Sequence, residues 1–112
     1  MDTSIDTMEL ENITSEIKKF FAESSIVVKR MILFGSRAKG TAGNDSDWDF
    51  LAIIDRKIDF EIQNRIRTLI RRRLAKQRIS VDIIIRSESA YEKDRTDTGN
   101  ITYYAVKEGV AV

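Results

Sequence analysis

Residues 33–50 carry the most informative pattern in the chain: Leu33-Phe34-Gly35-Ser36-Arg37-Ala38-Lys39-Gly40, a short polar link, and then Asp45-Ser46-Asp47-Trp48-Asp49-Phe50. The apolar residues from Ile26 to Phe34 predict a strand that ends at Gly35, and residues 47–54 predict a second strand. Residues 36–46 lack apolar periodicity, which indicates a loop. Because side chains alternate along a strand, the two aspartates of Asp-Trp-Asp would project from one face and the aromatic residues from the other.

The remaining sequence predicts helices around one further strand. Apolar residues recur at three- and four-residue steps from Thr7 to Phe21, where Asp6 or Thr7 would cap the helix, and again in residues 59–77. Residues 79–85 are apolar nearly throughout, so we expect a central strand covered on both faces. A short helix near residues 89–93 and a last helix over residues 101–107, ended by Gly109, complete the order. We therefore expect a single α+β (or α/β) domain over residues 1–112, with a small mixed sheet of three to four strands flanked by helices.

Composition excludes several kinds of chemistry. The chain has no Cys, His or Pro, which rules out disulfides, thiol nucleophiles, a Ser-His-Asp relay and zinc sites built on Cys or His. Its apolar runs are too short to cross a bilayer, and its first residues carry no secretory signal, so we expect a cytoplasmic protein. A net charge of +1 predicts no general attraction to nucleic acid.

The aspartates and the turn before them predict a site for metal ions and phosphate. Asp47 and Asp49 would lie roughly 7 Å apart along their strand and repel one another, a cost that a hard divalent cation such as magnesium relieves. At the strand end, Gly35 and Ser36 offer backbone N–H groups and a hydroxyl to a phosphate.

Three more residues complete the predicted site. Arg37 and Lys39 add positive charge at the same turn. Asp82, an isolated charge in the third predicted strand, is the candidate third carboxylate, either as a metal ligand or as the base for an attacking hydroxyl.

Gly35-Ser36, ten intervening residues and Asp47-x-Asp49, with Asp82 on a later strand, resemble the signature of the polymerase-β type nucleotidyltransferase superfamily. The small size, the Gly-Ser-Arg-Ala-Lys-Gly loop and the tail from Ala105 to Val110 resemble the minimal nucleotidyltransferases of prokaryotes. The resemblance implies the nucleotidyltransferase fold, a two-magnesium site at the three aspartates, and transfer of AMP from Mg-ATP with release of pyrophosphate. It further implies that the acceptor is a tyrosine of a partner HEPN-domain toxin, for which the small enzyme acts as antitoxin.

Other interpretations of the same residues stay open. Asp45 or Asp47 could cap the turn at the strand entry while Asp49 is solvated. Gly35-Ser36 could be a simple tight turn, and Asp82 could be an edge-strand residue that faces water or pairs with an arginine. At the level of function, the alternatives are an antitoxin that covers its partner without catalysis and a nucleotidyltransferase that modifies a small molecule.

Two predicted helix surfaces also have two interpretations each. The helix over residues 59–77 has a basic face that is either solvated or in contact with an acidic partner or RNA; it consists of Arg65, Arg71, Arg72, Arg73 and Lys76. That helix lacks interleaved aromatic residues, so we do not expect nucleic acid to be the main partner.

The last helix is apolar on more than one side. Ile101, Tyr104 and Ala105 lie on one side, and Tyr103 and Val106 lie elsewhere around it, which indicates either core packing or a partner surface.

Overall fold

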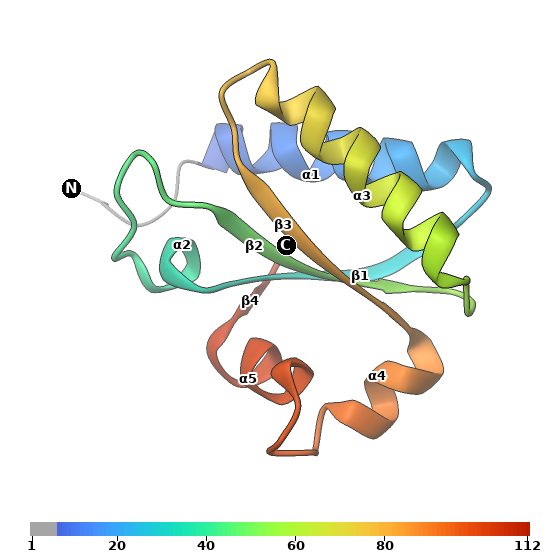
Figure 1. The fold of residues 1–112 in the computed structure, drawn as a ribbon. Coiled ribbons are helices and arrows are strands. Elements are labelled where there is room, and N and C mark those ends of the chain that lie inside the picture. The colour runs from blue at the N-terminus through green and yellow to red at the C-terminus, as the bar shows by residue number, and fades with distance from the viewer. Residues whose placement is uncertain (1–6) are drawn as a thin grey trace.

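The computed structural model describes residues 7–112, which form one sheet with helices on both of its faces (Figure 1). The elements in chain order are α1 (Thr7–Glu23), β1 (Val28–Phe34), α2 (Ser36–Lys39), β2 (Trp48–Ile54), α3 (Phe60–Ala75), β3 (Val81–Ser87), α4 (Glu88–Asp94), α5 (Ile101–Glu108) and β4 (Val110–Ala111). The cap predicted at Asp6 lies outside the described residues. None of the helices in residues 7–112 combines the length and apolar character that crossing a membrane requires.

The sheet has four strands in the order β3-β2-β1-β4. β1 runs antiparallel to both β2 and β4, whereas β2 and β3 run parallel. The sheet is therefore mixed, and the α+β class predicted from the sequence is confirmed.

Two apolar layers, one on each face, hold the helices to the sheet. On one face α1 and α3 pack over β1, β2 and β3, and their apolar faces supply Ile13, Ile17, Phe21, Ile66, Ile70 and Leu74. On the other face α4 and α5 contribute Tyr91 and Ala105, which pack with Ile32, Leu51 and Ile53. β2 is buried on both sides, so its alternating side chains serve the two layers in turn.

The structure corrects the prediction that the third strand is central. β3 lies at the edge of the sheet, next to β2 alone. Val81, Ile83 and Ile85 face the layer under α1 and α3, while Ile84 packs partly against the opposite layer and Asp82 is exposed. An apolar run reports how well the two faces are covered, and it carries no information on whether a second strand lies alongside.

The predicted loop over residues 36–46 begins with a helical turn. The Gly35 carbonyl accepts hydrogen bonds from the N–H groups of Ala38 and Lys39, and Gly40 ends the turn at a φ of 74°. A single turn buries no continuous face, which is why it leaves no apolar periodicity in the sequence.

The chain ends with a short strand that the sequence pattern does not reveal. β4 pairs with β1 through Ile32 and Leu33. The pairing requires Gly109, because a Cβ atom there would overlap the Ala105 carbonyl and approach the Ile32 side chain to 2.6 Å. The glycine predicted to end α5 therefore also lets the chain turn tightly back onto the sheet.

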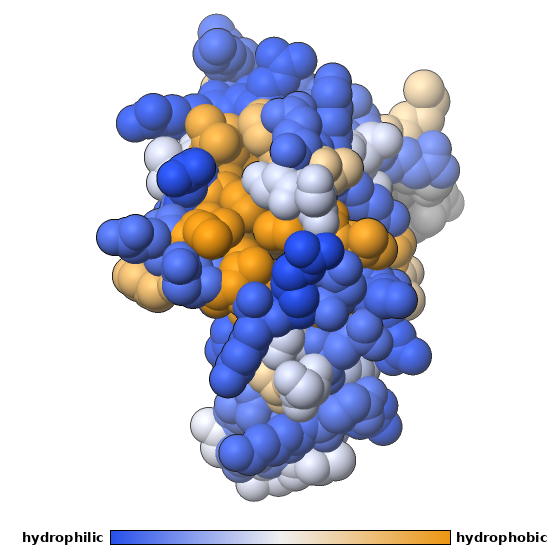
Figure 2. All heavy atoms as spheres, turned by 90° about the vertical axis from the view of Figure 1, so that its right-hand side faces the viewer, coloured by the Kyte–Doolittle hydropathy of each residue, from blue (hydrophilic) through white to orange (hydrophobic). Residues whose placement is uncertain are grey.

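Apolar side chains also gather at the carboxyl end of β2, on the face shown in Figure 2. A hollow of about 470 Å³ there is lined by Ile26, Ile58 and Ile62, with Arg56 and Lys57 among its polar neighbours. The aspartates of the predicted site lie at the opposite, amino end of β2. This hollow is therefore separate from the predicted site.

Thr102 provides a test of the packing around α5. Its side chain is fully buried, and its hydroxyl has no hydrogen-bond partner. Because an unpaired buried hydroxyl costs free energy that a methyl group of the same shape does not, we expect Thr102→Val to raise the free energy of unfolding by about 1 kcal/mol. Urea denaturation measures the change. Thr102→Ser, which keeps the hydroxyl and removes the methyl group, should lower stability; a destabilised Thr102→Val would contradict the assignment.

Candidate active site

The three predicted carboxylates gather at one end of the sheet. Asp49 in β2 pairs in register with Asp82 in β3, and Asp47 directly precedes β2. Residues paired in register on parallel strands point to the same face, so Asp49 and Asp82 project together. Asp49 is partly buried, and the other two are exposed. The structure therefore brings the three predicted side chains to the same end of the sheet.

Gly35 borders the site on the other side of Asp49. Phe34, the residue before it, pairs with Asp49 across β1 and β2. Gly35 has a φ of 75°, and a Cβ atom at this position would overlap the Asp49 carboxylate. Glycine is needed here both for the backbone conformation and for the space that the carboxylate occupies.

Ser36 follows as the first residue of α2. Its carbonyl accepts hydrogen bonds from the N–H groups of Gly40 and Thr41, which closes the turn behind it. The Ala38 and Lys39 N–H groups donate to the Gly35 carbonyl, which leaves those of Ser36 and Arg37 outside the hydrogen bonds of the turn. Because Gly35 abuts the Asp49 carboxylate, these two N–H groups lie at the end of the sheet that holds Asp49.

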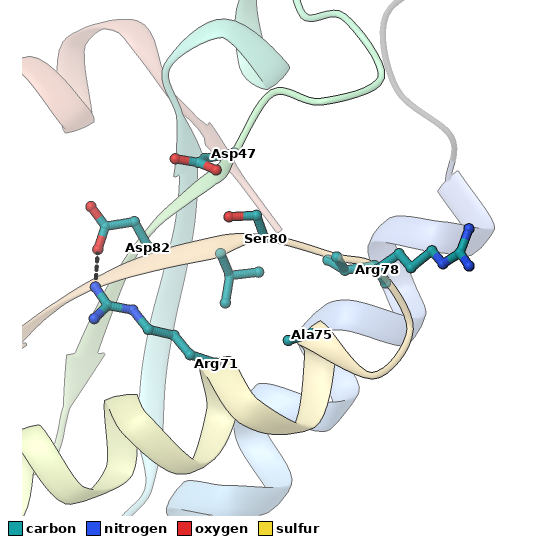
Figure 3. A pocket seen from close by; sticks show the side chains of 8 residues that line it. Asp47, Arg71, Ala75, Arg78, Ser80 and Asp82 are labelled. Atoms are coloured by element: carbon teal, nitrogen blue, oxygen red, sulfur yellow. Dashed lines mark hydrogen bonds and ion pairs between the residues drawn. The ribbon is translucent and has the colours of Figure 1, made fainter.

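Electrostatic repulsion is built into this end of the sheet. Burial raises the pKa of the Asp49 carboxyl group above its ordinary value, and the negative charges of Asp82 and Asp47 raise it further. Asp82 pairs with Arg71 of α3, with 2.7 Å between the Arg71 Nη2 and Asp82 Oδ1 atoms (Figure 3). One of the interpretations considered from the sequence, an edge-strand Asp82 paired with an arginine, thus describes its surroundings in the structure.

The donor set suits a hard divalent cation, although the carboxylates do not converge on one point. Among residues 7–112, no three Asp, Glu, His or Cys side chains lie in an arrangement that could hold a metal ion. Asp82 is directed toward Arg71. The three aspartates nevertheless offer only carboxylate oxygens, the ligands that magnesium prefers, and Gly35 leaves room beside Asp49. The donor atoms of these residues therefore suit magnesium.

The two cations predicted to contact phosphate are engaged elsewhere. The Arg37 guanidinium donates to the carbonyls of Asn44 and Ser46 and lies 4.4 Å from the centre of the Trp48 ring. Lys39 pairs with Glu108 of α5 at 2.8 Å. The structure therefore does not bring these side chains to the carboxylates, and they instead fix the loop after α2 and tie α2 to α5.

A groove runs along the outer edge of β3 beside the aspartates (Figure 3). We call it the edge groove; its volume is about 580 Å³, and it is lined by Asp47, Arg71, Ala75, Arg78, Ile79, Ser80, Val81 and Asp82. Sequence reasoning placed Arg71 on a basic helix face without linking it to Asp82. No local pattern could have done so, because the pair depends on how α3 crosses the edge of the sheet.

The raised pKa of Asp49 predicts that its charge destabilises the protein when no cation is present. An acid whose pKa is raised by folding weakens stability at pH values above the raised pKa, and the cost disappears below the ordinary value. We expect Asp49→Asn to raise the melting temperature at pH 7.5 in EDTA, with a difference from wild type that vanishes toward pH 3.5. Thermal unfolding followed by circular dichroism measures this.

Asp45→Asn is the matched control for this prediction. Asp45 is exposed and lies in the loop before β2, so its replacement should leave the melting temperature unchanged. A lower melting temperature for Asp49→Asn in EDTA, or a gain that persists at pH 3.5, would show that the repulsion does not limit stability.

The fold of this chain is similar to that of solved structures. A crystal structure of a toxin–antitoxin with AMP-PNP has a TM-score of 0.59 and 19% sequence identity, with 87% of this chain and 69% of that chain covered. A mutant of the toxin–antitoxin MntA-HpeT gives a TM-score of 0.58 and 17% identity, with the same coverage. At such identities the likeness shows a shared fold. A comparison with curated protein sequences finds no significant match.

The sequence itself places the chain in a family. The profile described as Polymerase beta, Nucleotidyltransferase matches residues 15–104, which include β1, α2, β2 and β3 and therefore all of the candidate site residues. The protein thus belongs to the polymerase beta nucleotidyltransferase family.

Proposed function

We propose that residues 1–112 form one minimal nucleotidyltransferase domain that transfers AMP from Mg-ATP to a hydroxyl group of a partner protein. The observation that carries the proposal is the position of Asp49, which has Gly35 against its carboxylate on one side and Asp82 in register on the other. A phosphate bound at Gly35 and Ser36 and an acceptor hydroxyl near β3 would then both lie beside the partly buried Asp49 carboxylate.

Each site residue has a role in this proposal. Gly35 and Ser36 bind the triphosphate through backbone N–H groups and the hydroxyl. Asp47, Asp49 and Asp82 hold magnesium ions, which when bound supply positive charge for the attacking and leaving oxygens. Asp82 accepts the proton of the acceptor hydroxyl as its oxygen bonds to the α-phosphorus and the bond to pyrophosphate breaks. Phosphate contacts from Arg37 and Lys39 require each to leave its present partner.

The acceptor that we propose is a toxin, specifically a tyrosine of a HEPN-domain protein for which this chain is the antitoxin. The two solved structures of similar fold are toxin–antitoxin complexes, and one of them was solved with AMP-PNP. The other carries two Asp-to-Glu substitutions two positions apart, the same spacing as Asp47 and Asp49. The HEPN class and the tyrosine follow from the family resemblance described above.

An apolar surface at the carboxyl end supports a protein partner. Ala105 is buried under the sheet, but Ile101 and Tyr104 of α5 and Val110 of β4 are exposed large apolar side chains. The fold uses only one side of α5 for its own core, which leaves the other side for another chain.

A second candidate is an antitoxin that neutralises its partner by covering it, without catalysis. The observation that favours it is the Arg71–Asp82 pair, which leaves the three carboxylates unassembled for a cation in this structure. The two candidates differ in whether inhibition of the toxin needs the aspartates.

A transfer assay tests the proposed function. The purified protein is incubated with α-labelled ATP, Mg²⁺ and the protein encoded by the neighbouring gene, and label on that protein is counted. We expect wild type to label it and Asp47→Asn/Asp49→Asn to lose at least about a hundredfold in rate, because bound cations contribute several kcal/mol to the transition state. Asp45→Asn should behave as wild type.

Two outcomes count against this proposal, one against the role of the aspartates and one against the need for catalysis. Labelling that survives in the double Asn variant would sink the mechanism. Cells that the double Asn variant protects from the partner as well as wild type does would favour the covering antitoxin over the enzyme.

A further inference from the structure

The ion pair between Arg71 and Asp82 lies at one side of the edge groove and occupies the predicted third carboxylate (Figure 3). Arg71 reaches across the outer edge of β3 from α3, and its Nη2 atom donates to Asp82 Oδ1 at 2.7 Å. Asp82 is the in-register neighbour of Asp49, and adjacent strands lie about 4.8 Å apart. The Arg71 guanidinium therefore lies next to two carboxylates of the candidate site, those of Asp82 and Asp49.

The pair is held only weakly. The Arg71 side chain is 54% exposed and the Asp82 side chain 56% exposed. Ion pairs with this exposure contribute little to stability, because water screens the attraction and two side chains lose their freedom. A divalent cation carries twice the charge and binds Asp82 together with its neighbouring carboxylates, so the arginine can be displaced.

Within residues 7–112, Arg71 has no ion-pair partner besides Asp82. Burial lowers the pKa of the Arg67 guanidinium, and the positive charge of Arg71 lowers it further. The negative charge of Asp82 raises the same pKa, and the positive charge of Arg86 lowers it. Arg67 lies over the Phe60 ring and donates to Asn64, and Arg86 pairs with Asp94. Arg67 and Arg71 thus both lie in the field of Asp82, and once that carboxylate is taken, Arg71 is repelled by Arg67 and attracted to any anion in the groove.

We propose that Arg71 changes partners when substrate binds: it pairs with Asp82 in the cation-free protein, leaves when a divalent cation takes that carboxylate, and then binds a phosphate of the nucleoside triphosphate. The inference rests on the proposed function, which brings a phosphate to Asp49. The planar fork of a guanidinium matches two phosphate oxygens, so the released side chain has a suitable acceptor nearby. Arg71 therefore weakens cation binding in the absence of nucleotide and strengthens nucleotide binding once the cation is bound.

The first measurement is divalent-cation affinity without nucleotide. Mn²⁺, which takes carboxylate and water ligands as Mg²⁺ does, is titrated into wild type, Arg71→Gln and Arg72→Gln, and free Mn²⁺ is followed by electron paramagnetic resonance. We expect Arg71→Gln to bind Mn²⁺ about three- to tenfold more tightly, since a competitor of modest strength is gone. Arg72→Gln removes the same charge from the next position of the exposed helix face and should leave the affinity unchanged.

The second measurement is the affinity for AMP-PNP at saturating Mg²⁺, by isothermal titration calorimetry. Arg71→Gln should bind it about tenfold more weakly, Arg72→Gln should match wild type, and Arg71→Lys should lie between, because lysine keeps the charge and loses the fork. Opposite changes in cation and nucleotide affinity from one substitution distinguish exchange of partners from a merely structural role, which would move neither or weaken both.

The outcomes separate this inference from the proposed function. Unchanged Mn²⁺ affinity in Arg71→Gln, or an equal gain in Arg72→Gln, overturns the exchange and leaves the proposed function standing. Tighter Mn²⁺ with unchanged AMP-PNP affinity overturns the phosphate contact and points to an acidic group of the acceptor. If the wild-type protein binds Mn²⁺ but does not bind AMP-PNP, the proposed function is overturned. The first measurement still decides whether Arg71 competes for Asp82. Wild type that binds no Mn²⁺ overturns both.

Discussion

The contact between Gly35 and the Asp49 carboxylate sets the geometry of the whole site. It exists because Phe34 pairs with Asp49 in the antiparallel ladder of β1 and β2. Asp49 also pairs with Asp82 in the parallel ladder of β2 and β3. A shift of one residue in either ladder would turn Asp49 toward the layer that holds Trp48 and Phe50. The apolar side chains of β2 oppose that shift, because they are buried in the two apolar layers on either side of the strand. This packing holds the Asp49 carboxylate in place despite the repulsion from its neighbours.

Much of this arrangement could be predicted from the sequence, because each helix and strand buries apolar residues at its own period. The spacing of Gly35, Ser36, Asp47 and Asp49 identified the turn and the carboxylates without any coordinates. The edge position of β3 could not be found, since an apolar run records covered faces and says nothing of neighbours. The partners of Arg37, Lys39 and Arg71 were also out of reach, because they depend on how distant elements cross.

Charge is distributed unevenly between the two sides of the edge groove. α3 and its flanks carry nine basic and two acidic residues over positions 56–78, while Asp47 and Asp82 line the same groove from the sheet. Opposite charges face one another across a surface open to water, where pairs form and separate at little cost. A stronger, buried ion pair would have made the sheet end more rigid and closed the carboxylates to any other cation.

The short strand β4 gives the carboxyl end of the chain a mechanical connection to the turn. Val110 pairs with Leu33, two residues before Gly35, and Lys39 at the end of α2 is tied to Glu108 at the end of α5. The exposed apolar side chains of α5 and β4 are thus joined through β1 to the turn at Gly35 and Ser36. A chain bound to that surface would therefore contact the strand pair whose next residue, Phe34, is the partner of Asp49 in the ladder.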